Sequence, residues 1–185
     1  MKKLIDANPQ RARKTWHKNQ YAYIPKTSES SPMTEKWENH TLQRVDAELD
    51  VQFPPGIVAA VSVAVLDNNG KALASLRKDY PVWEFAGGKV DPGETPRQAA
   101  VREIKEELGL DIRVVAFVGS LIVIRSDKSY LMLFYTGRRN DPGQKPKHSK
   151  REVEKTEWVR LASGPGDKLW WPATLDLWED ITALA

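Results

Sequence analysis

The sequence predicts an α/β fold, an α/β/α sandwich in which a mixed β-sheet lies between two layers of helix, preceded by an N-terminal extension. Two observations predict it. Segments such as 121–125 and 130–136 are apolar on both faces, as strands are in a sheet that is covered on both sides. Amphipathic helices are expected from Thr95, ahead of these strands, and within residues 170–181. The 185 residues suffice for one domain of about 130 to 150 residues plus an extension.

The extension is predicted to comprise residues 1–55 and begins with a basic arm. Residues 1–26 carry seven lysines and arginines against Asp6, a local excess of about +6, together with three tryptophan and tyrosine side chains. Such an arm could bind RNA through phosphate contacts and base stacking. Alternatively, it could be a poorly ordered extension that packs on the domain or on a second subunit.

A helix is predicted over residues 33–50. Trp37, Leu42, Val45 and Leu49 recur there at a spacing near that of one helix face. This helix could cover the sheet or mediate formation of a homodimer.

The globular domain is predicted to span residues 56–185. Its first two strands should form a hairpin, because the β-branched and small residues of 57–66 are followed by the turn sequence DNNG at 67–70. Further strands are expected at 112–118, 121–125 and 130–136.

Ahead of those later strands lies the most informative stretch, Gly88 to Leu110, which reads as a loop followed by a helix. Thr95 is a predicted N-cap, Pro96 suits the first helical position, and Gln98 completes a capping box. Gly109 supplies the stop. An apolar stripe on this helix should face the core.

Three carboxylates share one side of this helix, because Glu103, Glu106 and Glu107 stand at i, i+3 and i+4. On its own such a cluster could be a solvated acidic face. Gly87 and Gly88 precede the helix, however, and paired glycines let the backbone approach a metal or a phosphate closely. Oxygen ligands without cysteine or a nearby histidine suit Mg²⁺, with Mn²⁺ as a second possibility.

The spacing of this stretch resembles the complete Nudix box, carried by Gly88, Glu94, Arg102, Glu103, Ile104, Glu106, Glu107, Gly109 and Leu110. The resemblance implies the Nudix α/β/α sandwich and a pyrophosphohydrolase. It also implies that the Gly88 carbonyl and the carboxylates of Glu103, Glu106 and Glu107 bind Mg²⁺, and that Glu103 is a candidate general base. By the same resemblance, Arg102 and Glu94 brace the loop against the helix.

The resemblance extends beyond the box to MutT-like members of the family. In those proteins an acidic residue lies six positions before a tryptophan and contributes to metal binding or to orienting water; here it is Glu152 before Trp158, with Glu154 and Glu157 as neighbouring alternatives. Thr174 occupies the place where the 8-oxo-purine class has an asparagine that reads the base, so recognition of 8-oxo-purines stays open.

Arg77 and a basic loop are further candidates for binding phosphate. In the family the second strand of the hairpin often ends in a basic residue near the phosphates, and Arg77 holds that position, although it could be a solvated strand-end charge. Residues 138–151 carry six lysines and arginines against Asp141. This segment could close over a polyphosphate as a lid, or it could be a mobile surface loop.

The expected activity is Mg²⁺-dependent hydrolysis of a pyrophosphate bond in a nucleoside diphosphate-linked substrate. A nucleoside triphosphate cleaved to monophosphate and pyrophosphate is favoured, because WEF-x-GGK followed by PGE resembles MutT-like pyrophosphatases, although Ala86 replaces their usual proline. Alternative substrates are a dinucleoside polyphosphate, a nucleotide sugar, ADP-ribose or an RNA 5′ end. A binding module that senses a nucleotide is an alternative of another class.

The composition bears on the cellular location of the protein. The chain has no cysteine, which excludes disulfides and thiolate metal sites and fits a reducing compartment. No apolar run approaches the roughly 18 residues of a membrane span, and the basic start is not followed by an apolar signal segment. A cytoplasmic protein that does not contact membranes is therefore expected.

Overall fold

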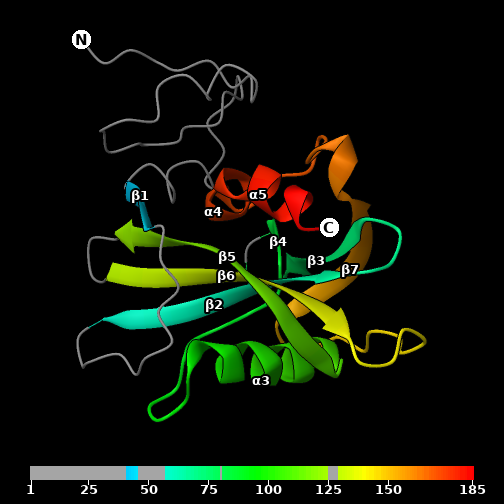
Figure 1. The fold of residues 1–185 in the computed structure, drawn as a ribbon, viewed down its shortest axis with the longest axis horizontal. Helices are drawn as coiled ribbons and strands as arrows, with labels where there is room; N and C mark the ends of the chain where they lie inside the picture. Colours follow the sequence, from blue (N-terminus) through cyan, green and yellow to red (C-terminus); the bar gives the residue numbers. More distant parts are fainter. Residues whose placement is uncertain (1–40, 46–56, 80, 125–128) are drawn as a thin grey trace.

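The structure, a computed structural model, describes residues 41–45, 57–79, 81–124 and 129–185 (Figure 1). The elements in chain order are β1 (Thr41–Val45), β2 (Val58–Leu66), β3 (Lys71–Arg77), β4 (Trp83–Glu84), α3 (Pro96–Leu108), β5 (Ile112–Ile124), β6 (Ser129–Arg139), β7 (Val153–Arg160), the 3₁₀ turn η1 (Leu161–Ser163), α4 (Pro172–Asp176) and α5 (Trp178–Ala183). The basic arm at residues 1–26 lies outside the described residues.

One mixed sheet organises these elements, as predicted. Its strand order is β1-β5-β6-β2-β3-β4, with β7 paired to β3. β2 and β6 run parallel, whereas β5 and β6 run antiparallel. Helix α3 covers one face and α4 and α5 cover the other (Figure 1), so the predicted α/β/α sandwich is confirmed. No helix in the described part of the chain is long and apolar enough to cross a membrane.

Each face of the sheet has its own apolar core because side chains alternate along a strand. In β2, Val61, Val63 and Val65 pack toward α3 together with Ile104. The intervening Ala64 and Leu66 pack toward α4 and α5 with the aromatic cluster. Full burial of a side chain of valine or leucine size contributes roughly 1.5 to 3 kcal/mol, so both helical layers are held mainly by apolar contact.

Helix α3 begins and ends where its local signals predict. The Thr95 N–H donates to the Gln98 side chain at 2.8 Å, and the Thr95 hydroxyl accepts from the Gln98 N–H, which completes the capping box. Pro96 occupies the first turn, and Gly109 adopts a left-handed conformation with φ of 67°. A non-glycine residue at that C-cap would be strained.

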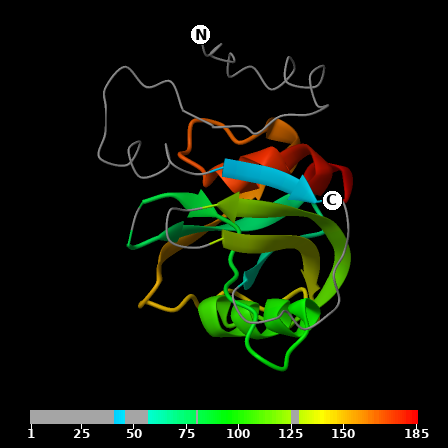
Figure 2. The same ribbon diagram turned by 90° about the vertical axis from the view of Figure 1, so that its left-hand side faces the viewer.

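The prediction of a helix over residues 33–50 is wrong for the part of this segment that the structure describes. Residues Thr41–Val45 form β1, which runs antiparallel to β5 from the pair Thr41↔Ile124 to the pair Val45↔Ser120 (Figure 2). Pairing with the free edge of β5 supplies backbone hydrogen bonds that outweigh a helical spacing of apolar residues. The rest of the predicted helix lies outside the described residues.

Two other predicted boundaries differ from the structure. The strands expected at 112–118 and 121–125 are one strand, β5, whose register against β6 shifts between Val114 and Ala116 and again between Phe117 and Gly119. β-bulges of this kind bend a strand without ending it. The helix expected within 170–181 is divided into α4 and α5 at Leu177.

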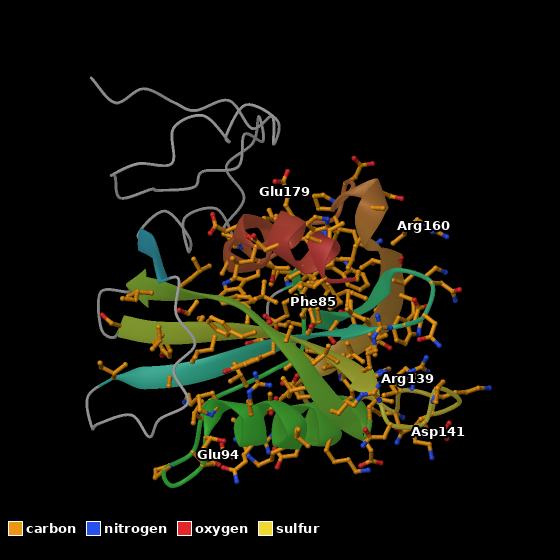
Figure 3. All side chains as sticks on the ribbon, viewed as in Figure 1. Phe85, Glu94, Arg139, Asp141, Arg160 and Glu179 are labelled. Atoms are coloured by element: carbon orange, nitrogen blue, oxygen red, sulfur yellow. The ribbon has the colours of Figure 1, made fainter. Side chains whose placement is uncertain are left out.

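The C-terminal segment is fixed to the strand that precedes the glycine loop. The Trp83 N–H donates to the Leu169 carbonyl, and the Trp171 N–H donates to the Trp83 carbonyl, both at 2.8 Å. Phe85, Trp170 and Trp178 pack against one another with ring centroids 4.8 to 6.1 Å apart. Figure 3 shows Phe85 between the sheet and the C-terminal helices. Trp170 and Trp178 are therefore core residues.

Candidate active site

A cleft of about 560 Å³ lies beside α3, and its lining is charged, polar or glycine throughout. The α3 helix, the glycine loop, the end of β3 and the segment before β7 each contribute to it. The lining residues are Arg77, Gly87, Gly88, Lys89, Asp91, Glu103, Glu106, Glu107, Ser149, Arg151 and Glu152. The fold thus brings together six of the seven residues that the sequence singled out for the site, and Thr174 is the exception.

Glu107 is the most deeply buried of the three helix carboxylates, with 6% of the residue exposed. Its Oε2 accepts a hydrogen bond of 3.2 Å from the Gly87 N–H. Burial raises the pKa of Glu107 to about 8, and the neighbouring carboxylate of Glu84 adds to that rise. A buried acid crowded by other acids favours either a proton or a cation.

Glu103 is held in the cleft by Arg102. The Arg102 Nη1 donates to Glu103 Oε1 at 2.9 Å and to Glu106 Oε2 at 3.3 Å. Burial raises the pKa of Glu103, while the adjacent guanidinium opposes that rise. The Arg102 side chain therefore keeps two like charges close together before any cation is present.

The same arginine braces the glycine loop. Its Nε donates to Glu94 Oε2 at 3.1 Å, and its Nη2 donates to the Lys89 carbonyl at 2.9 Å. The hydrogen bond from Arg102 lowers the pKa of Glu94. Glu94 lies on the loop that leads into α3 (Figure 3). Arg102 and Glu94 thus connect loop to helix, the role that the sequence resemblance implied.

The backbone of Gly88 lies directly against Glu103. A Cβ atom at Gly88 would stand 2.4 Å from the Glu103 carboxyl carbon. The Gly88 carbonyl accepts a 2.8 Å hydrogen bond from the Val61 N–H, and a carbonyl oxygen has a second lone pair. This close approach of the Gly88 backbone to the Glu103 carboxylate is one that only glycine permits.

The donor set fits a hard divalent cation. Its members are carboxylate and carbonyl oxygens, two of the carboxylates have raised pKa values, and Glu106 is 60% exposed at its side chain and so can reorient. Among the described residues, no three acidic, imidazole or thiol side chains already converge as a metal cage. Arg102 donates to one oxygen each of Glu103 and Glu106 instead, and the second oxygen of each carboxylate accepts no hydrogen bond from Arg102.

Arg77 lines the cleft but is engaged by acidic side chains. Its Nε and Nη2 donate to the two oxygens of Asp79, each at 2.8 Å, and its Nη1 donates to Glu84 Oε1 at 3.0 Å. Burial raises the pKa of Glu84, and Arg77 opposes that rise. Glu84 was not singled out from the sequence. The available signal was its position, two residues after Val82 and three residues before Gly87.

The segment before β7 supplies the remaining wall. Glu152 is exposed and lines the cleft together with Ser149 and Arg151. Of the two alternatives, Glu157 forms an ion pair with Lys168 at 3.2 Å, and neither it nor Glu154 lines the cleft. The geometry therefore favours Glu152 as the carboxylate contributed from outside the box.

This segment, which we call the strap (residues 140–152), is hydrogen-bonded to the end of α3. The Lys147 N–H donates to the Leu108 carbonyl at 2.8 Å, and the Ser149 N–H donates to the Glu107 carbonyl at 2.7 Å. The last carbonyls of a helix have no partner within the helix, so they attract such donors. The basic loop at residues 138–151 is thus hydrogen-bonded to α3. Neither the interpretation as a lid nor that as a mobile loop predicted these contacts.

Thr174 is not part of the cleft, contrary to its expected role in substrate binding. It is fully buried on α4, on the opposite side of the sheet from α3, and its hydroxyl has no hydrogen-bond partner among the described residues. Helix α4 turns this face toward the aromatic core, which includes Phe85, Trp170 and Trp178. Burial there separates Thr174 from the cleft residues.

A mixed sheet between helical layers, with a carboxylate-bearing helix beside a glycine loop, is the arrangement that the sequence resemblance implied. Residues 56–176 match the family model of the NUDIX domain, and the chain belongs to this family. Nudix hydrolases generally use divalent metal ions.

Curated relatives match a short part of the chain. The CTP pyrophosphohydrolase of Escherichia coli K12 is 45% identical over 64 residues, covering 32% of this chain and 47% of that protein. A putative 8-oxo-dGTP diphosphatase of Bacillus subtilis is 47% identical over 57 residues (31% and 38%), and an RNA pyrophosphohydrolase of Francisella tularensis is 39% identical over 64 residues (33% and 41%). The chain spans less than half the length of these relatives.

Solved structures agree on the fold. The solution structure of the E. coli ORF135 protein has a TM-score of 0.58 and 28% identity, covering 69% of this chain and 90% of that one. A MutT protein from Methanosarcina mazei has a TM-score of 0.61 and 21% identity, covering 69% and 94%.

Proposed function

We propose that this protein hydrolyses a nucleoside triphosphate to a monophosphate and pyrophosphate in the presence of Mg²⁺. The observation that carries the proposal is the cleft itself, in which Glu103, Glu106 and Glu107 of α3 meet Glu152 and Arg77. Relatives named CTP pyrophosphohydrolase and 8-oxo-dGTP diphosphatase support a triphosphate as the substrate.

The residues proposed to hold Mg²⁺ are Glu103, Glu106 and Glu107 with the Gly88 carbonyl. When bound there, the cation would supply neutralising charge at the phosphate oxygens and make the phosphorus more electrophilic. Mn²⁺ has the same preference for oxygen ligands and is expected to substitute.

The protein's own groups would then bind the phosphates and accept a proton. Arg77 and Arg151 offer guanidinium donors to the phosphate oxygens on one side of the cleft. A water molecule attacks the α- or the β-phosphorus, and its oxygen forms the new P–O bond while the bridge between these two phosphates breaks, which yields the monophosphate and pyrophosphate. The proton lost by this water passes to the carboxylate of Glu103 or Glu152, which is the general base of the proposal.

A panel of substrates separates this proposal from the alternatives. The purified chain is incubated with Mg²⁺ and, in separate reactions, each of the common nucleoside triphosphates, 8-oxo-dGTP, a dinucleoside tetraphosphate, a nucleotide sugar and ADP-ribose, and the products are identified by ³¹P NMR. We expect monophosphate and pyrophosphate from at least one triphosphate. Turnover restricted to the diphosphate-bridged compounds would refute the triphosphate assignment. Binding without turnover would support a nucleotide-sensing module, although sensing does not require three carboxylates.

An RNA 5′ end is the second candidate, favoured by the relatives named RNA pyrophosphohydrolase. The basic arm at residues 1–26 would then bind the RNA backbone. Deleting residues 1–30 should weaken binding of a 5′-triphosphorylated RNA and leave hydrolysis of free nucleotides unchanged. An unchanged affinity for RNA would remove the arm from this candidate function.

A further inference from the structure

One side chain of the strap, that of Gln144, forms hydrogen bonds with residues that follow the C-terminal end of α3. Its Oε1 accepts from the Asp111 N–H at 3.0 Å, and its Nε2 donates to Asp111 Oδ2 at 3.0 Å and to the Gly109 carbonyl at 3.3 Å. Both ends of the amide are therefore used. The Gln144 carbonyl also accepts from Arg139 Nη1 at 2.7 Å, so the residue is fixed from the side of β6 as well.

The contacts of Gln144 set the register of the strap on the C-terminal end of α3. A Cβ atom at Gly109 would stand 3.1 Å from the Lys147 carbonyl oxygen, so the strap lies against the helix cap without a gap. Beyond that point the Lys147 and Ser149 N–H groups pair with the carbonyls of Leu108 and Glu107. A shift of the strap by one residue would break each of these hydrogen bonds.

The register matters because the strap ends in the cleft. Ser149 pairs with the backbone of Glu107, a carboxylate of the site, and Glu152 follows three residues later. On the far side, the Glu152 carbonyl accepts a hydrogen bond of 3.0 Å from the Lys78 N–H at the end of β3. The strap therefore bridges α3 and β3, and its place on α3 and its pairing with the end of β3 together set where Glu152 and Arg151 stand relative to Glu107.

We propose that Gln144 is a positioning residue, which acts through the strap to set Glu152 and Arg151 against the carboxylates of α3. Gln144 is not among the residues that line the cleft, so it acts without touching the substrate. The proposal rests on the proposed function, in that Glu152 or Arg151 must contribute to turnover. A misplacement of about 1 Å at a reacting group can cost about a hundredfold in rate, so a contact outside the cleft is enough to matter.

The test variant is Gln144→Met, which keeps the length of the side chain and removes its hydrogen bonds. The matched control is Gln98→Met at the opposite end of the same helix, where the Gln98 side chain accepts from the Thr95 N–H at 2.8 Å. Both variants lose side-chain hydrogen bonds at a helix terminus. We expect kcat to fall about tenfold in Gln144→Met with a smaller change in KM, and to stay within about twofold of wild type in Gln98→Met. Equal kcat values in the two variants would overturn the proposal.

A rescue variant distinguishes positioning from general damage. In Gln144→Glu the side chain can no longer donate to the Asp111 carboxylate, which is paired with Lys105, or to the Gly109 carbonyl, so this variant should lose activity as Gln144→Met does. Adding Asp111→Asn restores a donor and acceptor pair between the two side chains. We expect the double variant to recover most of the lost kcat, whereas Asp111→Asn alone stays near wild type. No recovery would contradict the role assigned to the pair.

A measurement that does not depend on turnover separates this inference from the proposed function. Amide hydrogen exchange at Lys147 and Ser149 should accelerate at least tenfold in Gln144→Met and stay unchanged in Gln98→Met. Unchanged exchange in Gln144→Met would overturn the positioning role whatever the activity. If exchange accelerates but neither Glu152→Gln nor Arg151→Gln affects turnover, the proposed roles of those two residues fail, and with them the catalytic consequence of the strap.

Discussion

The carboxylate of Glu107 accepts a hydrogen bond of 3.2 Å from the backbone N–H of Gly87. This contact joins the acid-bearing helix α3 to the glycine loop at the floor of the cleft. The Glu107 side chain is buried, and burial, together with the neighbouring Glu84, raises its pKa to about 8. Without a cation the folded protein therefore favours the protonated form at neutral pH.

Binding of Mg²⁺ is expected to strengthen with pH up to about 8. Glu107 must lose its proton to become a ligand, so below its pKa each pH unit should change the affinity about tenfold. Isothermal titration calorimetry at pH 6, 7 and 8, in buffers of different ionisation enthalpy, measures both the affinity and the proton released. An affinity that is constant from pH 6 to 8 would contradict the assignment of Glu107 as a protonated ligand.

The free energy of unfolding of the metal-free protein should show the opposite trend and decrease as the pH rises. A carboxyl group whose pKa is raised in the folded state binds a proton more tightly there than when unfolded, so stability falls as pH rises from about 4.5 to about 8. Glu107→Gln has no such titration, and its amide oxygen can still accept from Gly87. We expect the variant to be more stable than wild type at pH 8.5 by about 2 kcal/mol, with no gain at pH 4. Urea unfolding at both pH values measures this difference, and addition of Mg²⁺ should stabilise wild type only.

Two adjacent glycines should respond differently to alanine. A Cβ at Gly87 would stand 2.0 Å from the backbone oxygen of Val61, which cannot move easily, so Gly87→Ala should lower Tm by more than about 10 °C or prevent folding. A Cβ at Gly88 would instead meet the carboxylate of Glu103, the end of a flexible side chain. Gly88→Ala should therefore fold and lose hydrolysis at least a hundredfold as Glu103 is displaced. Thermal unfolding combined with kcat/KM measurements would contradict this account if Gly88→Ala kept full activity.

Thr174 provides a test of the boundary of the site. Its hydroxyl is buried without a hydrogen-bond partner among the described residues, so Thr174→Val removes an uncompensated polar group and should stabilise the fold by about 1 kcal/mol. The relative kcat/KM values for the common nucleotides and 8-oxo-dGTP should stay within about twofold of wild type. A larger change in the preference among bases would contradict this prediction and show that Thr174 contributes to substrate recognition.

Features encoded by neighbouring residues were the most predictable from sequence. The capping box of Thr95 and Gln98, the stop at Gly109 and the spacing of Glu103, Glu106 and Glu107 are local signals, and α3 forms as they indicate. The Nudix box also predicted the fold and most of the cleft residues, since its loop and helix form one wall of the cleft.

Features that depend on distant partners were not predictable in the same way. The segment Thr41–Val45 has helical spacing, yet it pairs with β5 because that strand offers a free edge. The strap is polar and basic, and its hydrogen bonds to the C-terminal end of α3 have no local sequence signature. Thr174 occupies a plausible position in the chain, but α4 packs that face into the aromatic core.

Metal binding and turnover should be measured together in wild type, Glu106→Gln and Glu107→Gln. Mn²⁺ binding followed by electron paramagnetic resonance reports the site, and ³¹P NMR reports the products with Mg²⁺. We predict that wild type binds Mn²⁺ and releases monophosphate and pyrophosphate, whereas both folded variants bind Mn²⁺ weakly and lose turnover at least a hundredfold. Turnover near wild type in either variant, with the same products, would contradict the claim that these carboxylates hold the catalytic metal.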